Sequence, residues 1–119
     1  MLTGALIVES LRPGTVLQGV DLTVRRISRG AVSDPTPDQP AVWTLVEFAA
    51  QEHSADELAA RLADVLSGPG WYASFDVGDR VFVVFPGRVF QYDRSDRDAR
   101  AAVMRYALAA GVPEGQCDW

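Results

Sequence analysis

Few residues in this chain of 119 could act as a nucleophile, a base or a metal ligand. The single histidine, His53, stands in a polar run before a helix start, where an exposed flanking residue is expected. One histidine cannot build a multi-histidine metal site within one chain. The single cysteine, Cys117, has an aspartate beside it and no basic neighbour, which argues against a reactive thiolate and excludes an internal disulfide. We expect no metal and no cofactor, and catalytic residues stay unassigned.

Familiar catalytic and phosphate-binding motifs are missing as well. The glycine-rich stretch 67–70 lacks GxGxxG spacing and precedes a predicted strand, not a helix. All 11 basic residues are arginine, which excludes Schiff-base lysines and a Walker-type lysine. Asp93, Asp96 and Asp98 alternate with arginines at a predicted helix start, so dipole preference and mutual neutralisation explain them better than metal binding.

Glu47 has the most unusual setting of the charged residues. It lies within the apolar run 41–49, on the same side as Trp43 and Leu45, and must be solvated or paired. A cross-strand ion pair with an arginine such as Arg25 is the favoured interpretation. The alternative is a polar contact for a small ligand inside an aromatic concavity. The candidate ligand-binding residues are then Trp43, Glu47, Trp71, Tyr72 and Arg88.

Five strands are predicted from β-branched and aromatic runs bounded by Gly and Pro. They cover residues 20–28, 41–49, 71–75, 81–85 and 88–92. Residues 5–11 fit either a short helix or a buried strand, because a short apolar run has no diagnostic period. We favour the helix, since Glu9 and Ser10 interrupt any alternation.

Two helices are predicted from their caps. Ser54 and Glu57 form a capping-box pattern before a helix at 55–67, which Gly68 and Pro69 end. A second helix begins near Ser95, where the same pattern recurs, and ends at Gly111.

The order ββαβββα predicts a single α+β domain over residues 1–119. We expect an antiparallel sheet of about five strands with both main helices on one face, in a ferredoxin-like or permuted topology. If Pro86-Gly87 closes a two-residue hairpin, Val83 faces Phe90 and Val81 faces Tyr92. Apolar residues then project from both faces of the sheet, although the helices cover one. We therefore expect a homodimer or a protein partner at the other face. Its interface would hold Phe82, Val84 and Val89.

The chain also resembles a group of short, uncharacterised actinobacterial proteins. The resemblance rests on three segments, Val42-Trp43-Thr44-Leu45, Gly70-Trp71-Tyr72 and the run 81–92, and extends to Gly111-Val112-Pro113 and Asp118-Trp119. It implies a small cytoplasmic domain and no particular activity.

Charge and hydropathy restrict the function further. A net charge of −5 opposes binding to nucleic-acid phosphates. No apolar run approaches the roughly 20 residues of a membrane span, and the N-terminal segment lacks a basic region for a signal peptide, so a cytoplasmic location is expected. The favoured hypothesis is a non-catalytic domain that associates with itself or a protein partner. The alternative is a small-molecule binding protein or an enzyme with a pocket around Glu47.

Overall fold

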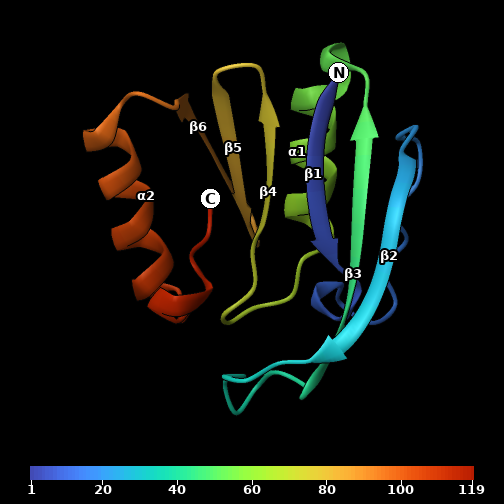
Figure 1. Ribbon diagram of the computed structural model, residues 1–119, viewed down its shortest axis with the longest axis vertical. Coiled ribbons are helices and arrows are strands. Elements are labelled where there is room, and N and C mark those ends of the chain that lie inside the picture. Colours follow the sequence, from blue (N-terminus) through green and yellow to red (C-terminus); the bar gives the residue numbers. More distant parts are fainter.

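The computed structural model describes all 119 residues and contains one antiparallel six-stranded sheet with two α-helices (Figure 1). The strands are β1 (Leu2–Ile7), β2 (Thr23–Ala31), β3 (Val42–Ala50), β4 (Ala73–Val77), β5 (Arg80–Phe85) and β6 (Arg88–Asp93). The helices are α1 (Ala55–Val65) and α2 (Arg97–Ala109), and the 3₁₀ turns are η1 (Val8–Ser10), η2 (Glu52–Ser54) and η3 (Glu114–Gln116). The α+β class is confirmed, with six strands in place of about five.

The additional strand is β1, so the helix expected at residues 5–11 is wrong. Strand β1 lies in the middle of the sheet, hydrogen-bonded to β3 on one side and to β4 on the other. Glycine at position 4 allows this packing, because a Cβ there would lie 2.6 Å from the Cβ of Phe75. Glu9 does not interrupt the structure: its carboxylate accepts hydrogen bonds from Thr44 of β3, where β1 has ended.

The strand order β2-β3-β1-β4-β5-β6 joins two three-stranded halves through β1. Within the second half, Val83 pairs with Phe90 and Val81 with Tyr92, so the predicted hairpin register is confirmed. Gly87 has φ 71°, which a type II turn requires at its third residue.

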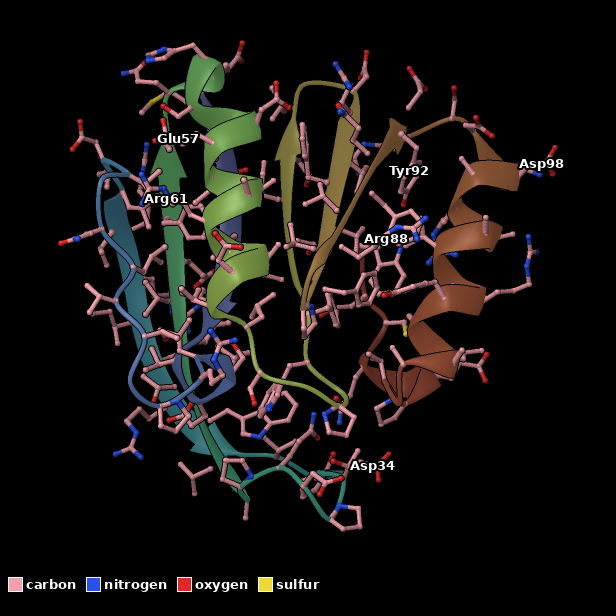
Figure 2. All side chains as sticks on the ribbon, turned by 180° about the vertical axis from the view of Figure 1, so that it is seen from behind. Asp34, Glu57, Arg61, Arg88, Tyr92 and Asp98 are labelled. Carbon is pink, nitrogen blue, oxygen red and sulfur yellow. The ribbon has the colours of Figure 1, made fainter.

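The two helices lie on opposite faces of the sheet, and the expectation that both share one face is wrong. Helix α1 buries Leu58 and Leu62 against Phe82 of β5, together with β1, β3 and β4. Helix α2 buries Val103 and Ala107 against the other side of β5 and β6. Figure 1 shows α1 behind the sheet, whereas the reverse view in Figure 2 brings it to the front. A ferredoxin-like topology finds no support in this arrangement.

Helix α1 begins at Ala55 as predicted and α2 has its N-cap one residue after Ser95, but neither predicted capping box forms. The 3₁₀ turn η2 runs directly into α1, so Ser54 has a helical backbone and its side chain caps nothing. At α2 the cap is Asp96, whose carboxylate accepts from the Ala99 N–H at 3.0 Å. Asp93 instead accepts two hydrogen bonds from Ser95, which lower the pKa of that carboxyl. Neither helix has the length and hydropathy needed to cross a membrane.

Candidate functional site: a groove on the open face of the sheet

The site lies on the face of the sheet that α2 covers only in part. Cross-strand pairing defines this face, because paired residues project to the same side. One row of such pairs runs across the sheet through Phe90, Val83, Ser74, Ala5, Glu47 and Arg26. Helix α2 packs at the β5–β6 end of this row, and β4, β1 and β3 continue beyond the helix. The C-terminal segment returns from the end of α2 and lies between α2 and the strands in the view of Figure 1.

A hollow of about 300 Å³ opens between these strands and the C-terminal segment. Its floor is apolar and comes from adjacent central strands, with Ala5 and Ile7 on β1 and Leu45 on β3. The walls and rim come from Trp43 of β3 and from three other segments, comprising Val32, Ser33, Asp34, Gly70, Trp71, Tyr72, Ala73, Ser74, Gly115, Gln116 and Asp118. We call this cavity the first hollow.

Two tryptophans in the wall of the first hollow hold each other in place. The ring centroids of Trp43 and Trp71 lie 5.0 Å apart at an interplanar angle of 56°. The Trp43 indole N–H donates to the Pro40 carbonyl at 2.9 Å, and Trp71 is only 6% exposed. Both indoles are therefore fixed by contacts within the protein, without any ligand.

A buried glutamine ties together the three segments that form the rim. Gln39, 8% exposed, donates through Nε2 to the Gly70 carbonyl at 3.2 Å and lies within hydrogen-bonding distance of the Gln116 side chain. The Gln116 amide in turn donates to the Asp34 backbone carbonyl at 3.0 Å. The sequence did not predict this role, because residues 30–40 are rich in Pro, Asp, Ser and Thr, which is the composition of a mobile loop. Burial of Gln39 depends on segments far away in the sequence, so no local signal marked it.

Tyr72 fastens the C-terminal segment over the sheet. Its single O–H proton is shared between the Asp118 carboxylate and the Gln116 carbonyl, and its oxygen accepts from the Asp118 N–H at 3.2 Å. The ring packs edge-on against Trp119 at 4.9 Å. Burial raises the pKa of Tyr72 well above its ordinary value, and the hydrogen bond to Asp118 raises it further. The phenol is therefore protonated at neutral pH and serves as a fixed donor. The C-terminal aromatic residue thus packs against the domain.

A second hollow of about 660 Å³ adjoins the first and shares Ala5, Ser74 and Asp118 with it. Glu47 lines this second hollow, where Arg26 approaches its carboxylate at 3.6 Å. The predicted cross-strand ion pair is thus present, with Arg26 as partner. A bulge between Val24 and Arg26 shifts the register, which explains why Arg25 is not the pairing residue.

The structure brings together three of the five candidate ligand residues, since Trp43, Trp71 and Tyr72 all line the first hollow. Glu47 lies in the adjoining one. Arg88 belongs to neither: its guanidinium lies over the rings of Phe90 and Tyr106, with centroid distances of 4.6 and 5.4 Å, at the α2 side of the molecule (Figure 2). Arg88 therefore lies apart from the other four candidates, because β6 is separated from β3 by β1, β4 and β5.

The predicted dimer surface is also altered. Phe82 is 3% exposed and Val84 is fully buried, because α1 covers them; they cannot form an interface while the helix is in place. Val89, at 37% exposure on the edge strand β6, is the accessible residue of the three. The homodimer stays a prediction, which light scattering at micromolar concentration tests.

The remaining reactive side chains lie outside the first hollow. His53 is exposed, as expected for a residue before a helix. Burial raises the pKa of the Cys117 thiol, and Asp118 and Glu114 raise it further, so the thiolate is disfavoured at neutral pH. No group of three or more His, Cys, Asp and Glu side chains gathers as a metal site would require.

Comparisons with family models, with curated proteins and with solved structures found no match to this chain. The resemblance to short actinobacterial proteins stays a prediction.

Proposed function

We propose that the chain is a non-catalytic binding domain that holds a small organic molecule in the first hollow. The observation that carries this proposal is the hollow itself, about 300 Å³ in volume, with an apolar floor and two fixed tryptophans. Small-molecule sites are concave, mostly apolar and largely preformed, and begin at about this volume.

Preorganisation supports binding at this place over binding elsewhere on the surface. The wall residues are fixed by the Trp43 hydrogen bond, the Gln39 bridge and the Tyr72 contacts with the C-terminal segment. A ligand entering the hollow does not have to order these groups, so less of its interaction energy is lost to entropy.

The polar groups of Tyr72 and Glu47 are already hydrogen-bonded or paired, which supports a binding role over a catalytic one. The Tyr72 hydroxyl is bonded to Asp118 and Gln116, and Glu47 is paired with Arg26. Ser33 and Ser74 line the hollow, but no histidine lies beside them to act as a base. The groups at the hollow thus hold its shape and offer contacts.

The arrangement of the helices weakens the case for self-association. That case rested on one apolar face left bare, whereas α1 and α2 each cover one face of β5. Accessible apolar side chains on the sheet include Ile7 and Leu45 in the floor of the hollow, as well as the exposed Val24, Ile27, Val42 and Val89 on β2, β3 and β6.

Blocking the hollow tests the proposal. Ala5→Phe places a phenyl ring on the floor, and Val24→Phe adds the same ring at a 53% exposed position on the edge strand β2. Three soluble probes share a phenyl ring and differ in charge: 2-phenylethanol, 2-phenylethylammonium and phenylacetate. In ¹H–¹⁵N spectra we expect at least one probe to shift the Trp43 and Trp71 indole signals saturably in the native protein and in Val24→Phe, but not in Ala5→Phe. Binding that survives in a folded Ala5→Phe protein would reject the first hollow as the site.

A further inference from the structure

The first hollow carries negative charge that the protein does not balance. Among its lining residues the only charged side chains are Asp34 and Asp118, and no arginine lines it. Neither carboxylate takes part in any of the salt bridges of the structure. Both residues are exposed at the rim, above the apolar floor.

We infer that the ligand of this hollow is an organic cation with an apolar or aromatic body, such as an aryl-alkyl ammonium compound. This inference rests on the proposed function and adds the chemical class of the ligand. An ammonium group at the rim would lie near two carboxylates, and its hydrophobic body would replace water over Ala5, Ile7 and Leu45.

The aromatic residues of the wall and the carboxylates of the rim both favour a cationic ligand. The faces of tryptophan and tyrosine rings attract ammonium groups through the ring quadrupole, and Trp is the best of the aromatic residues in this respect. Carboxylates at an exposed rim attract the same group without requiring the burial of an unpaired charge. The overall charge of −5 acts in the same direction at long range and low salt.

The second hollow differs from the first in its balance of charge. Its charges are mostly balanced, because Arg94 lies 3.2 Å from Asp76 and Arg26 pairs with Glu47. Arg25 lines it and forms no salt bridge. Asp118 also lines this hollow and offsets Arg25, so the second hollow is close to neutral and lacks the uncompensated negative charge of the first.

The same three probes test the charge preference. We expect 2-phenylethylammonium to bind roughly fivefold or more tightly than 2-phenylethanol, with phenylacetate weakest at the Trp43 and Trp71 signals. Added salt should weaken the binding of the ammonium compound and leave the affinity of the alcohol unchanged. Asp34→Asn should weaken the ammonium compound by about two- to fivefold and Asp118→Asn by a similar factor, each without affecting the alcohol.

Asp98→Asn is the matched control, since it changes the net charge equally and lies on α2, far from Asp34 in Figure 2. It should leave all three affinities unchanged. Equal binding of the three probes, tighter binding of phenylacetate, or an equal loss in Asp98→Asn would overturn the cation inference and leave the hollow as a binding site. Absence of binding by every probe at millimolar concentration would reject the proposed function, and the inference with it.

Discussion

Replacing Tyr72 with phenylalanine removes the one hydroxyl that fastens the C-terminal segment to the sheet. The ring contacts with Trp119 and Phe85 are kept, while two interactions are lost: the one O–H donation, shared between the Asp118 carboxylate and the Gln116 carbonyl, and the bond accepted from the Asp118 N–H. A hydrogen bond contributes about 1 kcal/mol net, and one to a charged group up to about 3 kcal/mol. Asp118 is exposed and regains water, so we expect Tyr72→Phe to lower the free energy of unfolding by about 1–2 kcal/mol.

The assay is urea unfolding followed by tryptophan fluorescence, with linear extrapolation to water. Tyr106→Phe is the control, because the Tyr106 ring packs against Phe85 at 4.9 Å but its hydroxyl forms no hydrogen bond in the structure. It should change the stability by less than about 0.5 kcal/mol. Equal effects of the two substitutions would refute the role of the Tyr72 hydroxyl.

Measuring the unfolding stability as a function of pH separates the contribution of the Tyr72 hydroxyl from that of its ring packing. The pKa of Tyr72 is raised in the folded state above its ordinary value of 10.0, so above pH 10 the unfolded chain loses this proton first. Stability from this group is complete below pH 10 and falls as the pH rises, by up to about 1.4 kcal/mol per pH unit. Tyr92 and Cys117 also have raised pKa values and add to the fall, so the quantity to compare is the difference between native protein and Tyr72→Phe. Parallel alkaline curves for the two proteins would contradict the assigned shift.

Three other substitutions probe separate parts of the structure. Gly4→Ala should destabilise by about 1–3 kcal/mol in urea unfolding, because its Cβ would lie 2.6 Å from the Cβ of Phe75; an unchanged midpoint would show that the sheet has room there. Arg88→Met should cost about 1 kcal/mol in a thermal melt at low and high salt alike, through the lost contact with the Phe90 ring, and should not alter probe affinity. Glu47→Gln breaks an exposed ion pair and should change stability by less than about 1 kcal/mol; loss of probe binding at the first hollow would move the site toward the second.

The second half of the fold could be predicted from sequence because its signals are local. Alternation in 81–85 and 88–92, with Pro86-Gly87 between them, determines the turn and the pairing of Val83 with Phe90. The same alternation shows that β5 is apolar on both sides. It does not show what covers each side, which is why both helices were expected on one face.

The N-terminal strand could not be predicted in the same way. Residues 2–7 have no turn signal linking them to a partner, and β1 pairs with β3 and β4 across long sequence separations. Position 4 requires glycine because a larger residue would collide with Phe75 and Phe48, which come from two other strands.

The aromatic part of the site was predictable and the polar part was not. Trp43, Trp71 and Tyr72 stood out by residue type on predicted strands, and the fold brings them to one hollow. Asp34 and Gln39 come from a loop without regular structure, and Asp118 reaches the site through the C-terminal segment. Their positions depend on tertiary hydrogen bonds, for which the sequence carries no period.

Intermolecular nuclear Overhauser effects test the central claim most directly. With 2-phenylethylammonium bound, the probe's ring protons should show contacts to the methyl groups of Ile7 and Leu45, on the floor of the first hollow. Contacts instead to Leu58 or Leu62 of α1, on the other face of the sheet, or to exposed Ile27 on β2, would place the ligand elsewhere and contradict the central claim.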